Sequence, residues 1–258
     1  MWVGQQLADG LDFWGFLGSL ILGGIILGIY TGLLGYVGAK TGLSLDLLSQ
    51  RAFGEKGSYL PSAMTSFTQI GWFGVGSFVS GGTATPNFAR FAKNGKAGAI
   101  TTVVAFFIGN SLMFFFGAVS SIFVGGNDIF EVMVRLNLFY LAVLVLGLNI
   151  WTTNDNALYT AGLGLANIFH QRKKPMVLLS GIIGTVASVW LYYNFCGWLN
   201  ILNCTLPPVG IILVISYFMN KKAYDTDTIK IVTVNWFAVA GVILGAIVAN
   251  VVTWGIAS

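Results

Sequence analysis

Long apolar segments separated by short polar ones dominate the hydrophobic pattern of this chain. A helix needs about 20 apolar residues to cross a bilayer core of about 30 Å. Alternating ten-residue strands, which a transmembrane barrel requires, do not occur. The pattern therefore predicts an all-α polytopic membrane protein whose residues 1–258 form one transmembrane domain. The predicted spans are 13–38, 98–124, 137–167, 175–194, 199–219 and 232–255, with a further apolar region at 58–90.

The composition supports this prediction and narrows the class of function. Only 9% of the residues are charged and 56% are hydrophobic, whereas about 25% of a soluble domain is charged. The chain holds one histidine, His170, and two cysteines, so histidine–cysteine metal clusters and Ser-His arrangements are excluded. We expect no catalytic residues, no enzyme activity and no nucleic-acid partner. The expected location is an inner membrane, as a monomer in the lipid bilayer.

The basic residues indicate how the spans are oriented. Twelve of the thirteen Lys and Arg residues lie in four clusters, at 39–57, 90–96, 169–175 and 220–231, and Arg135 lies alone at 125–136. Cytoplasmic loops collect Lys and Arg. If the region 58–90 crosses an even number of times, all four clusters are cytoplasmic; if it crosses once, the cluster at 39–57 lies outside. The first arrangement follows the rule better.

The region 58–90 is too long for one span and too short for two. Its first part, up to Gly76, is an apolar helical pattern, whereas SFVSGGTATPNFAR at 77–90 is small, polar and interrupted by glycine and proline. We interpret this change as a discontinuity at 76/77, where a segment is missing from the chain. The alternative is a re-entrant hairpin in an intact chain.

The most informative polar residues lie inside the span at 137–167. Asn149, Thr152, Thr153, Asn156 and Thr160 fall on one face of a helix at i, i+3, i+4, i+7 and i+11. Polar groups at membrane depth face a partner or a water-filled cavity, and threonine hydroxyls suit a hard cation such as sodium. The alternative is a hydrogen-bonded seam between helices. Asp155, the only ionisable residue in a span, lies off this stripe, and we expect it to have a structural partner or a helix-end role.

A second candidate site lies in TQIGWFGVG. Gln69 and Trp72 share a helix face, and together they offer a hydrogen-bonding amide and a flat π surface for a planar heterocycle. The alternative for Trp72 is an interfacial aromatic belt. Ser77, Phe78 and Ser80 precede the break at Gly81-Gly82, where a broken helix exposes backbone groups to a substrate.

Six segments carry a resemblance to a known family: GLNIWTTNDNALY, LGIYTGLLGYVGAKTGLS (27–44), GSYLPSAMTSFTQIGWFGVG (57–76), FFIGNSLMFFFGA (106–118), SGIIGTVASVWLYYNF (180–195) and LPPVG (206–210). They resemble the nucleobase–cation symporter-1 family, and within it the cytosine permeases. The resemblance runs through nearly the whole chain. It implies an inverted-repeat transporter of twelve helices with a five-plus-five helix core. Parts of the first, third, fourth, fifth and last helices have no counterpart here, which makes the fold incomplete.

The resemblance also implies roles for the candidate residues. Trp72 and Phe78 would sandwich a base, whose edge would bond to Gln69, Ser77, Ser80 and Asn149. A sodium ion would take ligands from Thr152, Thr153 and the Asn149 region, and cytosine would enter with it by alternating access. The alternatives are transport of a related purine, hydantoin or allantoin, a truncated fragment without transport, and a channel, which would need a polar face on several helices.

Overall fold

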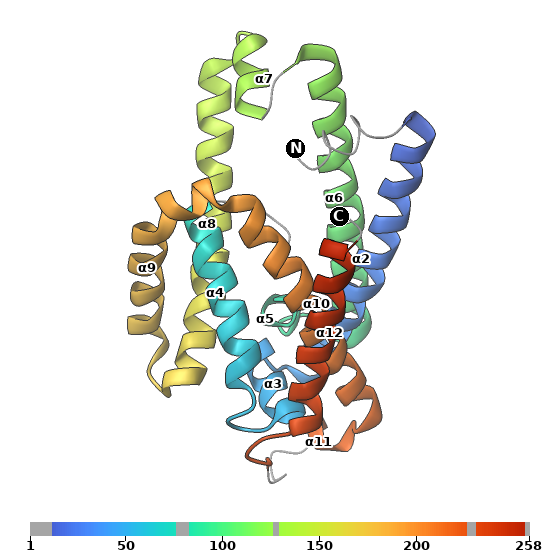
Figure 1. The fold of residues 1–258 in the computed structure, drawn as a ribbon, viewed down its shortest axis with the longest axis vertical. Helices are drawn as coiled ribbons and strands as arrows, with labels where there is room; N and C mark the ends of the chain where they lie inside the picture. Colours follow the sequence, from blue (N-terminus) through green and yellow to red (C-terminus); the bar gives the residue numbers. More distant parts are fainter. Residues whose placement is uncertain (1–11, 76–82, 126–128, 226–230, 256–258) are drawn as a thin grey trace. The chain divides into compact units, whose positions relative to one another are not determined.

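The computed structural model describes residues 12–75, 83–125, 129–225 and 231–255 (Figure 1). No residue in these ranges is in a strand. The long helices are α2 (Phe13–Thr41), α4 (Tyr59–Val75), α6 (Gly95–Val124), α8 (Phe139–Phe169), α9 (Lys173–Tyr193), α10 (Phe195–Met219) and α12 (Trp236–Gly255). The short helices are α3 (Leu45–Phe53), α5 (Pro86–Ala89), α7 (Ile129–Arg135) and α11 (Lys222–Asp225). The prediction of an all-α fold is confirmed.

Each predicted span corresponds to one long helix, within a few residues at either end. Four helices are long and apolar enough to cross a membrane on length and composition: Phe13–Thr41, Gly95–Val124, Lys173–Leu191 and Gly197–Met219. The apolar stretch of α12, Trp236–Val252, is shorter. These helices support a polytopic membrane protein, as the hydrophobic pattern predicts.

The segment 39–57, which holds the first basic cluster, contains a helix that the apolar pattern did not predict, α3. Ser44 caps the helix by accepting the Leu47 amide at 3.4 Å. Asn87, which is fully buried, accepts the Leu45 amide through its side-chain oxygen at 2.8 Å. The apolar pattern missed α3 because it is short and carries Asp46, Gln50 and Arg51. The predicted discontinuity at 76/77 lies outside the described residues and stays a prediction.

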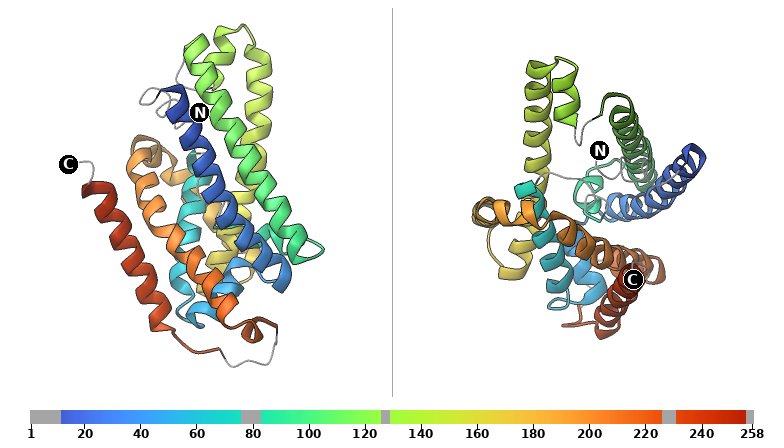
Figure 2. Two further views of the ribbon diagram at one scale, coloured as in Figure 1. Left: turned by 90° about the vertical axis from the view of Figure 1, so that its right-hand side faces the viewer. Right: turned by 45° about the horizontal axis from the view of Figure 1, so that its top comes forward.

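The contacts divide the chain into two compact units. The first unit comprises residues 1–32 and 100–152, and the second comprises 33–99 and 153–258. In the first unit, α2 and α6 lie side by side (Figure 2), with Phe16, Leu20 and Ala118 buried together. Gly24 permits this approach, because a Cβ there would lie 3.0 Å from the Phe107 ring.

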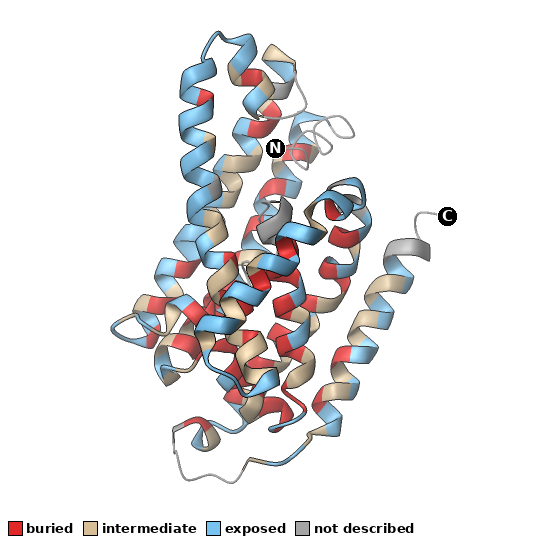
Figure 3. Ribbon diagram, turned by 90° about the vertical axis from the view of Figure 1, so that its left-hand side faces the viewer, coloured by how far each residue is buried: buried red, intermediate tan, exposed pale blue. Residues whose placement is uncertain are grey.

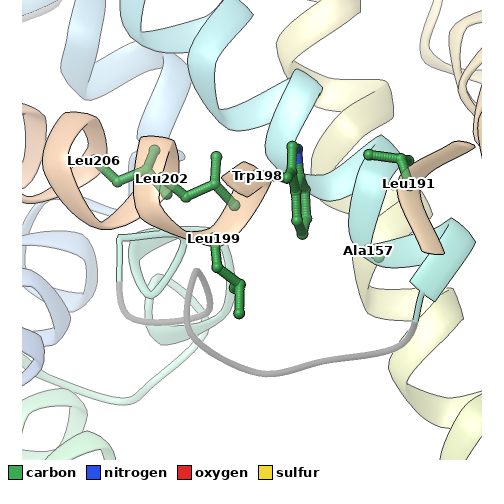
Figure 4. Packing of buried hydrophobic residues seen from close by; sticks show 6 residues of the cluster. All are labelled: Ala157, Leu191, Trp198, Leu199, Leu202 and Leu206. Carbon is green, nitrogen blue, oxygen red and sulfur yellow. The ribbon is translucent and has the colours of Figure 1, made fainter. Parts of the chain in front are cut away.

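The second unit holds the larger core. Trp198, Leu199, Leu202 and Leu206 of α10 pack with Ala157 of α8 and Leu191 of α9 (Figure 4). α4 packs mainly against α9, and α12 against α10. α12 buries Ala238 and Val242, one turn apart, and leaves most of its other apolar side chains exposed (Figure 3). Such one-sided burial is expected of a helix whose remaining surface faces lipid.

Candidate functional site

The predicted cation ligands lie on α8, and two of the three are exposed. Asn149 and Thr152 are exposed and Thr153 is half-buried. The Thr152 hydroxyl donates to the backbone carbonyls of Leu148 and Asn149, at 3.1 Å each. Because its proton points back into the helix, the oxygen lone pairs of Thr152 remain available to an outside ligand. This geometry suits a cation ligand as well as a simple helix-surface threonine.

The rest of the polar stripe divides along the helix. Asn156 is exposed, whereas Thr160 is 2% exposed and its hydroxyl has no hydrogen-bond partner in the described part of the chain. The stripe is therefore not a uniform seam between helices, because its accessible part runs from Asn149 to Asn156 and only its last member is buried in the protein.

The predicted base-binding residues are described in part. Gln69 lies on α4 and is 6% exposed. The α4 backbone carries Trp72 one turn further on, so the two residues share a helix face as predicted. The side chain of Trp72 and the whole of Ser77, Phe78 and Ser80 lie outside the described residues. Gln69 and Thr153 belong to the second unit, and Asn149 and Thr152 to the first. Their assembly into one site stays a prediction.

Trp198 of α10 was not among the predicted site residues, and it lies against α4 at Gly71. A Cβ on Gly71 would lie 2.2 Å from the Trp198 ring, so the indole fits only because residue 71 has no side chain. Gly71 is two residues from Gln69, and Trp198 is 3% exposed. The Gly71-Trp72 pair was visible in the sequence, but nothing in the pattern indicated which helix would cover the glycine.

A buried polar cluster in the second unit was also missed. Asn167 on α8 donates to the hydroxyls of Ser58 and Ser62, at 3.0 and 2.9 Å. It accepts the amide of Gln50 on α3 at 2.6 Å. Ser62 in turn donates to Asp46 at 2.6 Å. This network joins α3, α4 and α8 at one end of α4, and its members satisfy one another.

Burial changes the acid–base behaviour of Asp46, which is 5% exposed. Loss of hydration raises the pKa of its carboxyl group from 3.8 to about 6, while the Ser62 hydrogen bond and the charge of Arg90 act in the opposite direction. Nothing in the apolar pattern distinguished Asp46 from a solvated loop residue.

Asp155 does not have the helix-end role that the sequence suggested, because it lies in the middle of α8 and is exposed. Among the described residues the only ion pair joins Arg135 and Glu131, at 2.6 Å. The structural partner expected for Asp155 is therefore not found in the described part of the chain.

The accessible polar stripe of α8, from Asn149 to Asn156, offers neutral oxygen groups, and the exposed Asp155 carboxylate lies off this stripe on the same helix. No group of three or more His, Cys, Asp or Glu side chains comes together within the described ranges. Carbonyl, amide and hydroxyl oxygens suit hard monovalent cations and the hydrogen-bonding edge of a polar organic molecule.

Comparison with known proteins points in the same direction. The sequence profile of a family described as "Permease for cytosine/purines, uracil, thiamine, allantoin" matches residues 1–84 and 74–257. A cytosine permease of Escherichia coli strain K12 is 37% identical over 336 aligned positions, which cover 95% of this chain and 80% of that protein. An allantoin permease of Bacillus subtilis strain 168 is 34% identical over 82 residues, 32% of this chain and 16% of that protein.

Proposed function

Because the chain belongs to the family of permeases for cytosine, purines, uracil, thiamine and allantoin, we propose that it carries cytosine across a cell inner membrane. The observation that carries the proposal is the 37% identity to a cytosine permease, which extends over 95% of the chain. The relatives are named permeases, which are transporters and not enzymes. The accessible polar face of α8, in an otherwise apolar helix, supports a ligand site on that helix.

In the proposed mechanism, cytosine lies between the rings of Trp72 and Phe78. Gln69, Ser77, Ser80 and Asn149 would bond to its edge, where an amide offers both a donor and an acceptor. These interactions suit a flat heterocycle, because stacking holds its faces and hydrogen bonds select its edge.

Sodium is the proposed coupling ion. Its ligands would be the hydroxyl oxygens of Thr152 and Thr153 and an oxygen of Asn149, and the orientation of the Thr152 proton supports this role. An ion that binds together with the base favours the conformations that hold both, and alternating access then releases both on the other side.

We further propose that a segment present in the relatives is missing at 76/77. The alignment to the cytosine permease spans 336 positions although this chain has 258 residues, so the relative contains residues without a counterpart here. The family profile matches in two pieces, 1–84 and 74–257, which overlap at 74–84. If this segment is needed for closure, the chain binds cytosine without transporting it.

The four basic clusters are proposed to face the cytoplasm, as the distribution of Lys and Arg favours. Labelling of single engineered cysteines in intact cells checks this orientation. Positions in 90–96 and 169–175 should be protected from a membrane-impermeant reagent, and positions in 125–136 should react.

Thermal stabilisation of the purified protein tests binding and coupling together. Cytosine should raise the melting temperature in sodium buffer and much less in potassium buffer, because sodium completes the site. Stabilisation that is equal in both cations would contradict sodium coupling. No shift in either cation would contradict cytosine binding by this chain.

Asn149→Ala is the sharpest single variant for the substrate site. We expect at least a tenfold loss of cytosine affinity, since a site built to bond a polar edge loses binding when one partner is removed. The melting temperature without ligand should stay close to that of the unmodified protein, because Asn149 is exposed. Asn203→Ala, an exposed asparagine on α10, is the matched control and should keep its affinity.

Allantoin is the second candidate substrate, because the similarity to the allantoin permease is 34% over 82 residues. Both molecules offer a polar ring edge, and they differ in shape and in donor pattern. Parallel titrations with cytosine, uracil, a purine and allantoin decide between them by the lowest half-saturating concentration.

A further inference from the structure

A cavity of about 500 Å³ lies where the end of α2 meets the start of α6. Its lining includes Lys40, Lys93 and Lys96, together with Tyr36 and Asn94. All of these residues belong to the second unit. The volume falls in the range of about 300–1,000 Å³ that small-molecule sites occupy. The three lysines therefore surround one concave space.

The lysines have no acidic counterpart there. No carboxylate lines the cavity or pairs with Lys40, Lys93 or Lys96 within the described part of the chain. Three ammonium groups that share one cavity repel one another unless an anion lies among them. Lysines that serve only to orient the protein in the membrane need to lie on the cytoplasmic side, but they need not share a cavity.

Two glycines of α6 allow the cavity to form. A Cβ on Gly95 would lie 2.8 Å from the Tyr36 ring and 3.3 Å from the Lys40 side chain. A Cβ on Gly98 would lie 2.4 Å from that of Ala39. The two helices therefore meet more closely than larger residues permit, and Lys96, next to Gly95, is held near Lys40.

Polar hydrogen-bond donors complete the lining. The Tyr36 ring stacks on Phe218, with centroids 6.2 Å apart and planes at 9°, and this contact fixes the ring that carries the hydroxyl. The side-chain oxygen of Asn94 accepts the Ala97 amide at 2.8 Å, which leaves its NH₂ group free to face a ligand. Ammonium, hydroxyl and amide donors together match a phosphate, whose oxygens are strong acceptors.

The position of the cavity indicates where that phosphate comes from. α2 and α6 are both long and apolar enough to span a membrane, and the cavity lies where one ends and the other begins. Leu33, one turn before Tyr36 on α2, is exposed and would lie under a bound acyl chain. Basic pockets at the ends of membrane helices bind anionic lipid headgroups.

We propose that this cavity binds the phosphate headgroup of an anionic phospholipid. Lys40, Lys93 and Lys96 neutralise the phosphate, while Tyr36 and Asn94 donate hydrogen bonds to it. The bound lipid then ties the end of α2 to the start of α6. The proposal is independent of the identity of the transported substrate.

The test compares variants of the full chain, purified and titrated with phosphatidylglycerol in mixed micelles. Lys40→Gln, Lys93→Gln and Lys96→Gln are combined in one variant, and Lys56→Gln, Lys174→Gln and Lys222→Gln in a second with the same change of charge. All six side chains are exposed, so both variants should fold. Bound lipid is counted by native mass spectrometry, and thermal stabilisation gives the half-saturating concentration.

We expect the cavity variant to need at least ten times more phosphatidylglycerol for half-saturation, and the control variant to match the unmodified protein. Replacing the same three lysines with arginine should preserve binding. Tyr36→Phe, which keeps the stacked ring, should weaken binding by about threefold. Phosphatidylcholine should bind weakly to all variants, because its choline group cancels the phosphate charge.

Three results would overturn the proposal. An equal loss of affinity for phosphatidylglycerol in the control variant would show that the lipid is attracted by surface charge in general and not by this cavity. Equal binding of phosphatidylcholine would show that the lysines do not select an anion. Inorganic phosphate is also titrated against the lipid-bound protein. If it displaces the lipid and saturates the cavity at the same concentration as the lipid does, the cavity is a site for a soluble anion.

Discussion

Two asparagines on α8 lie in very different surroundings along a single helix. Asn167 bonds to Ser58, Ser62 and Gln50 and joins three helices. Asn149 lies five turns earlier and is exposed. A polar side chain that holds helices together has its donor and acceptor groups occupied by other protein groups. A side chain that binds a ligand must keep its donor and acceptor groups open to that ligand. Surroundings, and not residue type, separate the two roles.

The largest effect is expected from pH, through Asp46. The pKa of its carboxyl group is about 6 in the folded protein and 3.8 without the fold, so between these values the folded state holds a proton that the unfolded state has lost. The free energy of unfolding should therefore fall as pH rises from about 4 to about 6, by about 3 kcal/mol in total. Chemical denaturation at several pH values measures this dependence.

Asp46→Asn checks the assignment to this residue. Its side-chain oxygen can still accept the Ser62 hydroxyl, but it no longer ionises. The fall in stability between about pH 4 and 6 should disappear, and the variant should be more stable than the unmodified protein at neutral pH. Asp155→Asn, an exposed carboxylate on α8, is the control. An unchanged pH dependence in Asp46→Asn would assign the titration to another group.

Asn167→Ala is expected to have the next largest effect. It removes three hydrogen bonds at once, the two that Asn167 donates to Ser58 and Ser62 and the one that it accepts from Gln50, and each hydrogen bond contributes about 0.5–1.5 kcal/mol. We expect a loss of about 2 kcal/mol in the free energy of unfolding. Asn149→Ala should leave the free energy of unfolding almost unchanged. Similar losses at the two positions would break the distinction between a structural and a ligand-binding asparagine.

The smallest effect on stability is expected at Thr152. Its hydroxyl donates only within its own helix, so Thr152→Ala should change the free energy of unfolding by less than about 0.5 kcal/mol. The sodium dependence of cytosine stabilisation should nevertheless be lost. Thr185→Ala is a matched control, because Thr185 is exposed and donates to the Gly181 carbonyl in the same way. Retained sodium dependence in Thr152→Ala would remove this residue from the proposed cation site.

The hydrophobic pattern predicted the long helices well, because crossing a membrane requires an unbroken apolar run. The span predicted at 137–167 is α8, Phe139–Phe169. The span predicted at 232–255 begins only at Trp236 as α12. The preceding residues lie along the end of α3, where Asn235 donates to the Ala52 carbonyl at 2.8 Å. That contact joins residues 183 positions apart, which no local pattern can predict.

The candidate site was predicted only where it depends on a single helix. The shared face of Gln69 and Trp72 follows from their spacing and is present on α4. The indole of Trp198 against Gly71 depends on how α10 packs on α4. The buried state of Asp46 likewise depends on three helices, so a pattern read along α3 alone could not reveal it.

The sequence by itself determined that this is a membrane protein of many helices, since apolar runs of this length have no other stable solvent. It also determined the permease family, since the family's motifs recur along nearly the whole chain. Only the tertiary structure decided which polar residues are satisfied and which are accessible, and that three lysines from separate segments share one cavity. Burial and proximity depend on contacts between distant segments, because each helix obtains its neighbours only when the chain folds.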